Sequence, residues 1–422
     1  MTQTLLAAGV FLVAYALIVS EKVHRTLSAL AGAMLLIELG VLSQEEAFRA
    51  IDLNVIFLLV GMMVIASILS ETGAFQWLAA AAVRLSGGRP FAMLVVLSAV
   101  TALASALLDN VTVVVLIAPM TLYAAAHLRL NPTPFLIAET LASNLGGAAT
   151  LIGDPPNILI GSAAGIDFAT FAAHMAPIAL LSLATMLGVM YLLMRRELRA
   201  ADGPPAAAII DARSLITNWP LLRKSLVIMA LVLVGFVLHG ALGLEPATIA
   251  ITGATLLLLW SRRDPHPCFT QVEWTTLFFF IGLFVLVEGL VKVGLIQMAA
   301  DAILRLTGGN LRLTATALLW FSGLASGIVD NIPYTATMLP LVESLGRAMP
   351  AGPLWWALAM GADFGGNLTL IGASANLVIA TVAERAGHPI TFRSFLKYGL
   401  SATAAVLLLC TAYLWLRYLL WM

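Results

Sequence analysis

Charged residues are scarce in this sequence. Only 10% of its 422 residues are Asp, Glu, Lys or Arg, whereas soluble globular proteins average about 25%. Hydrophobic residues make up 61%, and the 22 acidic residues balance the 22 basic ones. This composition predicts a multi-pass protein of the cell inner (plasma) membrane, in contact with the lipid bilayer. It gives no indication of nucleic-acid binding.

Cysteines and enzyme motifs are also few. The two cysteines, Cys268 and Cys410, lie far apart and form no metal-ligand or redox spacing. The sequence contains no His-Glu-x-x-His, Gly-x-Ser-x-Gly or Walker A motif. We therefore expect no catalytic residues, no metal site, no cofactor and no ATP hydrolysis by this chain. A separate ATPase subunit stays compatible with the sequence.

Long apolar runs predict the membrane spans. A helix needs about 20 apolar residues to cross a bilayer. The N-terminal run lacks the basic segment and the cleavage site of a signal peptide, so we interpret it as the first span. The single spans are predicted near 3–20, 27–42, 53–71, 172–194, 224–241, 246–261, 274–291 and 395–420.

Four further segments do not fit a simple span. Residues 91–126 and 311–347 each hold two short apolar runs joined by an Asp-Asn pair. We predict a re-entrant hairpin in each, and two short spans with a tight turn are the alternative. Residues 134–163 and 354–381 are each interrupted by Gly-Gly and a polar cluster. We predict a broken helix in both.

The two halves of the chain repeat each other. Residues 146–157 (GGAATLIGDPPN) match residues 365–376 (GGNLTLIGASAN) at seven of twelve positions. We predict repeats over 1–198 and 222–422, joined by a cytoplasmic linker over 199–221. Each repeat would cross the membrane five times and add one hairpin, and an odd number of crossings makes the second repeat inverted.

Basic residues favour the cytoplasmic side of short loops. One side collects most of them, which places the first hairpin on the cytoplasmic side and the second on the external side: Lys22, Arg25, Arg84, Arg89, Arg129, Arg195, Arg196, Arg199, Arg213, Arg223, Lys224, Arg262 and Arg263. Six others make the bias imperfect: Lys292, Arg305, Arg312, Arg385, Arg393 and Lys397.

The Asp-Asn pairs are costly in a membrane. A carboxylate at the bilayer centre costs about 2.5–3.5 kcal/mol on insertion scales, and such residues usually mark an ion, proton or substrate path. Asp109 and Asp330 are therefore candidate site residues. Each could instead cap the half-helix that follows it, and the two roles are compatible. Inverted repeats with broken helices are typical of secondary transporters, whose sites lie near the midplane.

The candidate site follows from these motifs. The predicted substrate- or ion-binding residues are Asp109, Asn110, Asn144, Thr150, Asn157, Asp330, Asn331, Asp363, Asn367, Thr369, Ser374 and Asn376. The predicted helix-break residues are Gly146, Gly147, Gly153, Asp154, Gly365, Gly366 and Gly372. Asp154 precedes two prolines and is as suited to capping as to binding. Its equivalent in the second half is Ala373, whereas Asn144 is aligned with Asp363.

The motifs L-D-N-V-T, G-G-A-A-T-L-I-G-D-P-P-N and their second-half counterparts resemble the ion transporter superfamily. The similarity is greatest to the branch that holds the ArsB arsenite permeases, the NhaD sodium/proton antiporters and the melanosomal P protein. The resemblance implies an all-α, elevator-type carrier, often a homodimer. The hairpins and broken helices are then expected to move as one body against the spans near 27–42, 172–194, 246–261 and 395–420.

The resemblance also bears on the substrate. The superfamily's dicarboxylate carriers have Ser-Asn-Thr at the hairpin tips, where this chain has Asp-Asn. A carboxylate repels a dicarboxylate but can hold a proton or a cation, and the motifs contain no basic anion site. The segment G-A-D-F-G-G (361–366) resembles arsenite permeases and favours Asp363 as a proton or substrate group.

We therefore predict efflux of arsenite or antimonite, a small inorganic solute, coupled to protons and driven by the proton motive force. A sodium/proton antiporter, which would use sodium, and a carrier of another anion or neutral solute are the alternatives. A channel is a third class, and a membrane enzyme is disfavoured by the missing motifs.

Overall fold

The computed structural model describes residues 2–20, 22–199 and 215–420. These residues form helices and connecting turns, with no strand among them. Seven of the described helices are long and apolar enough to cross a membrane. The prediction of an all-α, multi-span membrane protein is confirmed. Most of the predicted linker, residues 200–214, lies outside the described residues.

The first ten helices run from the N-terminus to Arg199. Their bounds are α1 Thr2–Ser20, α2 Arg25–Glu38, α3 Gln44–Arg49, α4 Leu53–Ser70, α5 Ala74–Leu85, α6 Pro90–Ser105, α7 Asn110–His127, α8 Thr133–Gly147, α9 Pro155–Ala164 and α10 Phe168–Arg199. The predicted hairpin is the pair α6–α7, and the predicted broken helix is the pair α8–α9.

The next ten helices follow the same order of long and short elements. Their bounds are α11 Trp219–Leu242, α12 Pro246–Ser261, α13 Pro265–Thr270, α14 Trp274–Lys292, α15 Leu295–Thr307, α16 Leu311–Ser326, α17 Asn331–Gly346, α18 Ala351–Gly365, α19 Ser374–Arg385 and α20 Phe392–Leu414. A short π-helical turn, Trp415–Leu419, extends α20. The second hairpin is α16–α17, and the second broken helix is α18–α19.

One predicted span ends earlier in the structure, and four helices outside the predicted spans were missed: α3, α5, α13 and α15. The helix predicted over 27–42 ends at Glu38, because Gly40 turns the chain with a φ of 69°. The short helices α5 and α15 follow α4 and α14 directly. Each begins after a glycine in the left-handed region, Gly73 or Gly294, which lets the chain change direction in one residue.

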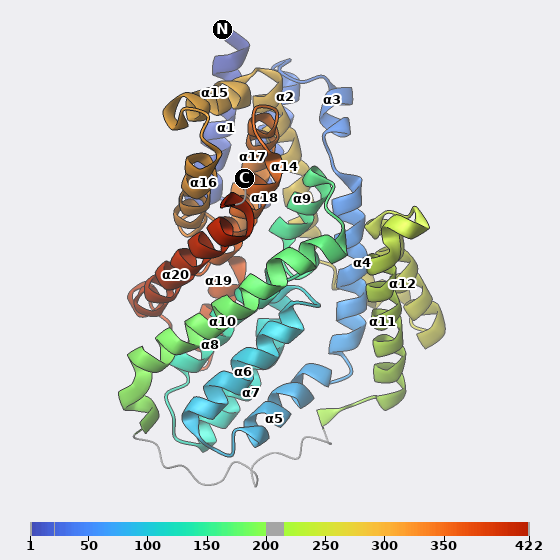
Figure 1. Cartoon of the computed structure of the whole chain (residues 1–422). Helices are drawn as coiled ribbons and strands as arrows, with labels where there is room; N and C mark the ends of the chain where they lie inside the picture. Colours follow the sequence, from blue (N-terminus) through green and yellow to red (C-terminus); the bar gives the residue numbers. More distant parts are fainter. Residues whose placement is uncertain (1, 21, 200–214, 421–422) are drawn as a thin grey trace.

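The hairpins enter the molecule from opposite ends (Figure 1). Helices α6 and α7 fill its lower part and α16 and α17 its upper part, so that the two hairpin tips approach each other in the middle. Helix α8 packs against α6 and α7, and α18 packs against α16 and α17. Each hairpin is therefore joined to the broken helix of its own half.

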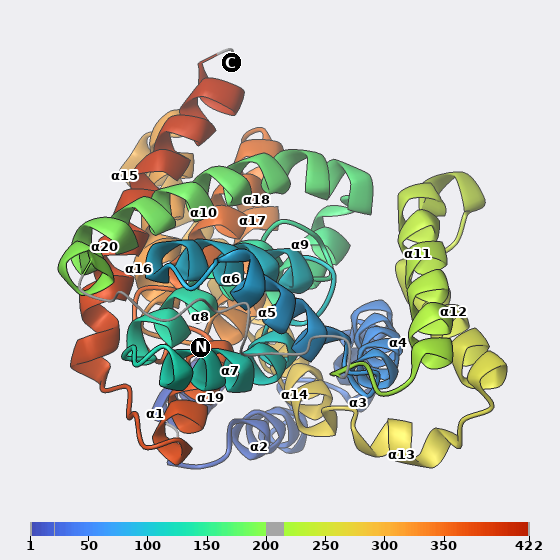
Figure 2. The same ribbon diagram turned by 90° about the horizontal axis from the view of Figure 1, so that it is seen from below.

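The remaining long helices form two sets. Helix α4 packs against α12 and α14 against α2, and Figure 2 shows α11 and α12 side by side next to α4, apart from the other helices. By contrast, α10 packs against α8 and α20 against α18. This corrects the expectation that residues 172–194 and 395–420 belong with the outer spans. Gly399 allows the close approach, since a Cβ there would lie 2.5 Å from the Asn367 carbonyl oxygen.

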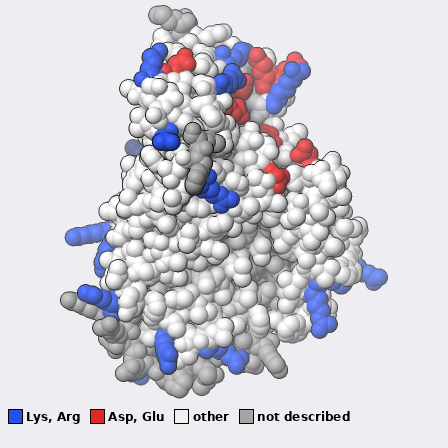
Figure 3. Space-filling model, in the orientation of Figure 1, with Lys and Arg blue, Asp and Glu red and all other residues white. Residues whose placement is uncertain are grey.

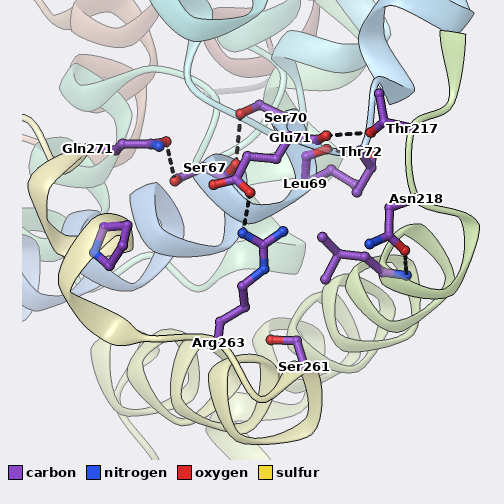
Figure 4. Close-up of polar contacts among 12 residues, drawn as sticks. Ser67, Leu69, Ser70, Glu71, Thr72, Thr217, Asn218, Ser261, Arg263 and Gln271 are labelled. Atoms are coloured by element: carbon purple, nitrogen blue, oxygen red, sulfur yellow. Dashed lines mark hydrogen bonds and ion pairs between the residues drawn. The ribbon is translucent and has the colours of Figure 1, made fainter.

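Charges lie mainly at the two ends. In Figure 3 the lower end of the visible face carries Lys and Arg, while Asp and Glu appear only toward the upper end. One basic residue ties the end of α4 to the chain after α12. Figure 4 shows the Arg263 guanidinium pointing at the Glu71 carboxylate, and the two groups are 2.5 Å apart. The Thr217 hydroxyl donates to the Glu71 carbonyl beside this pair.

Candidate functional site

The aspartates at the hairpin tips cap the helices that follow them. Asp109 precedes α7, and its Oδ2 accepts from the Thr112 amide at 2.8 Å and from the Thr112 hydroxyl at 2.9 Å. Asp330 precedes α17, and its Oδ1 accepts from the Ile332 amide at 3.1 Å. The capping role is confirmed for both. Each carboxylate keeps acceptor capacity for other partners, since it offers about four lone-pair directions.

Asp154 connects the two hairpin tips. It stands just before α9, yet its side chain makes no capping bond there. Its Oδ2 instead accepts from Asn110 Nδ2 at 2.9 Å and from Asn331 Nδ2 at 3.3 Å. One carboxylate thus joins the tips of hairpins from both halves, and of the two roles that the sequence left open for Asp154, the side-chain helix cap is not formed.

A chain of amides extends from this point. The Asn110 amide also donates to Asn144 Oδ1 at 3.2 Å. Asn144 Nδ2 in turn donates to Asn367 Oδ1 at 2.8 Å and to Asn376 Oδ1 at 3.0 Å. All four side chains are buried, so their mutual bonds replace water at membrane depth. The network crosses from the first half of the chain to the second.

The helix breaks are closed by equivalent bonds. Asn157 Nδ2 donates to the carbonyls of Gly147 and Thr150 at 3.1 and 3.0 Å. Asn376 Nδ2 does the same to Gly366 and Thr369 at 2.8 and 2.9 Å. These amides satisfy carbonyls that would otherwise be unpaired in the bilayer.

The predicted hydroxyl groups are used in the same way. The Thr150 hydroxyl donates to the Ala106 carbonyl and the Thr369 hydroxyl to the Gly327 carbonyl, both at 2.5 Å. Each bond ties a break to the hairpin tip of its own half. The hydroxyls of Thr150 and Thr369 are therefore positioning groups.

The glycines allow backbones to meet. A Cβ at Gly146 would lie 2.1 Å from the Ala102 carbonyl oxygen, and one at Gly365 would lie 2.4 Å from the Gly323 carbonyl oxygen. At the glycines inside the breaks, a Cβ would lie 2.5–3.1 Å from the nearest backbone oxygen: Gly147, Gly153, Gly366 and Gly372. The predicted break residues thus let broken helix and hairpin pack at backbone distance.

A cavity of about 330 Å³ opens where the two tips meet. Its polar lining comes from both halves and from α2 and α14: Arg25, Asp109, Asn110, Asp154, Glu273, Thr275, Thr276, Asn331 and Ser374. This volume lies in the range of small-molecule sites. Asp363 is fully buried outside this lining, and within the described part of the chain neither of its carboxyl oxygens has a hydrogen-bond partner.

Two charged cavity residues were missed by the sequence analysis. Arg25, expected in a surface loop, donates from Nη1 to Asp330 Oδ2 at 3.3 Å and to Ser374 Oγ at 2.9 Å. Its guanidinium also lies 5.3 Å from the centre of the Phe279 ring. The motifs themselves contain no basic residue, but the fold brings a basic group from outside them to the site. Glu273 precedes α14, and the signal for it was its alignment with Asp52 in the repeat.

Comparison with known proteins shows the family to which this chain belongs. A model of the citrate transporter family matches residues 15–361. The chain belongs to that family. The resemblance to the ion transporter superfamily is thereby confirmed. An uncharacterized transporter of Mycobacterium tuberculosis is 45% identical over 99% of both chains. The P protein of Homo sapiens is 35% identical and matches 94% of this chain and 58% of its own length.

A solved structure agrees on the fold. The YdaH transporter of Alcanivorax borkumensis superimposes with a TM-score of 0.61, covering 99% of this chain and 98% of its own, at 16% identity. The chain is therefore a membrane transporter by family, and its fold agrees with that of this solved structure.

Most of the predicted site residues fall into three groups. Asp109, Asn110, Asn331 and Ser374 line the cavity, together with Asp154, which was predicted as a helix-break residue, and Asp330 lies beside it and accepts from the Ser374 hydroxyl. Asn144, Asn367 and Asn376 belong to the amide network, and Asn157, Thr150 and Thr369 fasten the breaks by bonds to backbone carbonyls. Asp363 is buried outside these groups. No three His, Cys, Asp or Glu side chains of the described residues gather into a metal site.

Proposed function

We propose that this transporter exports arsenite or antimonite in exchange for protons. The observation that carries the proposal is the cavity at the hairpin tips, lined by carboxyl and amide groups from both halves. A neutral trihydroxide such as arsenite can donate to carboxylates and accept from amides. Carboxyl groups at membrane depth can also take up and release protons, as proton relays in pumps and transporters do.

The charge of the cavity supports a neutral or cationic solute. Among the described residues that line it, Arg25 is the only basic side chain, and it is paired with Asp330. Asp109, Asp154 and Glu273 add carboxyl groups that form no ion pair with a described basic side chain. A tricarboxylate would be repelled by these carboxylates. We therefore do not propose citrate, after which the family is named, as the substrate of this chain.

An inverted repeat and an elevator movement belong to the same proposal. In Figure 1, α1 begins at the upper end and its counterpart α11 begins at the lower end, which supports inversion. The packing suggests a moving body of α6–α10 and α16–α20 against a frame of α2, α4, α12 and α14. We also propose that the protein is a homodimer in the inner membrane, with the linker between the two halves on the cytoplasmic side. The basic lower end in Figure 3 supports this orientation.

The elevator part has a direct test. Ser162 on α9 donates to Asp52 at the start of α4, so this contact bridges the body and the frame. In a variant that lacks Cys268 and Cys410, Asp52→Cys with Ser162→Cys should form a disulfide that stops transport, and reduction should restore it. Each single cysteine variant is the control. Full transport by the oxidised double variant would refute the elevator movement.

Sodium/proton antiport is the second candidate, because the Asp154 carboxyl group interacts electrostatically with both Asp109 and Asp330, and amide oxygens lie close by. Oxygen-rich sets of this kind suit hard cations. The distinction is made in proteoliposomes with an imposed acid gradient and a pH probe. Arsenite uptake that dissipates the gradient, with sodium inert, supports metalloid exchange. Dissipation by sodium or lithium alone would replace the metalloid by a cation.

The carboxyl groups at the tips provide the matching variants. Asp109→Asn and Asp330→Asn keep the shape of the capping side chains and remove their charge. We expect each to reduce solute-driven proton movement at least tenfold. If both variants kept wild-type coupling, the tip carboxylates would have no part in the mechanism.

A further inference from the structure

The two helix breaks contain equivalent side-chain pairs that differ in one group. In the first half, Asn144 lies before the break, and its Nδ2 donates to Asn376 Oδ1 at 3.0 Å. In the second half, the equivalent position is Asp363, whose interaction partner is Asn157, the counterpart of Asn376. Asp363 has an oxygen where Asn144 has an NH2 group, so the donor of the first pair has no counterpart in the second.

The orientation of the Asn157 amide is fixed by its surroundings. Its Nδ2 donates to two backbone carbonyls, those of Gly147 and Thr150, as Asn376 Nδ2 does to Gly366 and Thr369. A carbonyl can only accept, so the nitrogen must lie on that side of the amide. By the equivalence with Asn376, the Asn157 oxygen then faces Asp363.

Three acceptor atoms therefore lack a donor in one buried place. Asp363 and Asn157 are both fully buried. Within the described part of the chain, Asp363 Oδ1, Asp363 Oδ2 and Asn157 Oδ1 have no hydrogen-bond partner. Buried polar groups are rarely left in this state, and a group of unpaired acceptors indicates a missing donor or cation. One hydrogen on Asp363 supplies the missing bond to Asn157.

Asp154 is the titratable neighbour that interacts electrostatically with Asp363. Among the other titratable side chains on helices packed against α18, Glu139 on α8 bonds to Thr121 and His174 on α10 to the Tyr418 hydroxyl. On α16 and α17, Arg312 bonds to the Leu419 carbonyl, Tyr334 donates to the Ser322 hydroxyl, and Glu343 lines a separate cavity. Arg195 on α10 and Arg393 and Lys397 on α20 are exposed, and the Tyr413 hydroxyl on α20 donates to the His174 carbonyl. No basic side chain among these supplies a charge to Asp363.

We propose that Asp363 and the Asn157 amide oxygen form a one-proton site, in which the neutral Asp363 carboxyl group donates its O–H to Asn157 Oδ1. Loss of this proton leaves a carboxylate against a carbonyl oxygen. The deprotonated state is therefore compatible with transport only when the break rearranges. The assignment of this proton as the coupling proton rests on the proposed function, whereas the site itself rests on the two equivalent pairs.

The test replaces one atom of the carboxyl group. Asp363→Asn provides an N–H toward Asn157, as Asn144 does toward Asn376, and should therefore fold. In proteoliposomes it should exchange labelled arsenite for unlabelled arsenite, but proton movement driven by the solute should fall at least tenfold. Glu139→Gln is the matched control, because Glu139 is an equally buried acid on α8 outside this pair. It should keep wild-type coupling. Wild-type coupling in Asp363→Asn would overturn the coupling role.

Infrared spectroscopy tests the site independently of transport. The wild type at neutral pH should show the carbonyl band of a hydrogen-bonded protonated carboxyl group, and Asp363→Asn should remove it. Asn157→Leu keeps the acid without its acceptor and should shift the band. An unchanged spectrum in either variant would overturn the proposal, as would loss of the wild-type band on adding sodium. If the wild type moves no protons with any solute, the proposed function fails, and the infrared result still decides the site.

Discussion

The ion pair between Arg25 and Asp330 gives the most direct prediction about the cavity. It joins the start of α2 to the second hairpin tip, with 3.3 Å between Arg25 Nη1 and Asp330 Oδ2. The Arg25 and Asp330 side chains are 30% and 15% exposed, respectively. Exposed pairs contribute about 0–1 kcal/mol, and breaking a fully buried pair costs about 3–5 kcal/mol. For this partly buried pair we expect a coupling free energy of about 1–2 kcal/mol, a factor of about 5–30 in the folding equilibrium.

A double-mutant cycle measures this coupling. The variants are Arg25→Met, Asp330→Asn and the double variant, and the readout is the free energy of unfolding in detergent. Arg25→Lys is a further control, since it keeps the charge but loses the planar guanidinium over Phe279. Effects of independent sites usually add within about 0.3–0.5 kcal/mol. Additivity within that limit would refute an energetically important pair and the role of Arg25 as the counter-charge in the cavity.

Further predictions concern other parts of the structure. Gly365→Ala should lower the free energy of unfolding by about 1–3 kcal/mol, because the new Cβ would overlap the Gly323 carbonyl. Gly188→Ala is the control and should not lower it, because the space around Gly188 is open. Equal effects of the two substitutions in thermal unfolding would show that the close packing at Gly365 is unimportant. Arg263→Ala should lower the free energy of unfolding by about 1 kcal/mol, because it removes the ion-pair partner of Glu71. Adding Glu71→Gln to this variant should lower the free energy of unfolding only a little further. Lys292 and Ser43 lower the pKa of Glu46 from 4.5 to about 2, so the stabilisation by ionised Glu46 should be complete above pH 4.5 and be lost as the pH falls toward 2. A stability difference between wild type and Glu46→Gln that shrank between pH 8 and 5 would contradict this.

Much of the fold was predictable because the repeat carries its own signals. Asp-Asn marks each hairpin tip, and Gly-Gly followed by a polar cluster marks each break, so these elements were found within a few residues. The short helices α5 and α15 were missed because each is separated from the preceding span only by a short turn that ends in a glycine. Which long helix packs against which broken helix depends on close contacts such as Gly399 against Asn367, which periodicity does not encode.

The site was predictable where the two halves agree. Asn110, Asn157 and the break glycines have counterparts in the second half, and each takes part in the site or its scaffold. The role of Asp154 was not predictable, because a residue before two prolines suits a helix cap, and only the fold shows its carboxylate between Asn110 and Asn331. Arg25 was missed for a similar reason, since its position before a span is typical of a residue at the membrane surface.

The differences between the halves are the chemically informative part of this molecule. A duplicated scaffold with identical side chains would present two equal half-sites. Here Asp330 is neutralised by Arg25, while no described basic side chain forms an ion pair with Asp109. Likewise, Asp363 stands where the first half has Asn144, and it has no N–H to give to Asn157. One carboxylate at the tips and one carboxyl group behind them thus lack the partner that their counterparts have among the described residues. The residues that repeat in both halves form the scaffold of the site, and the residues that differ between the halves determine what the site binds.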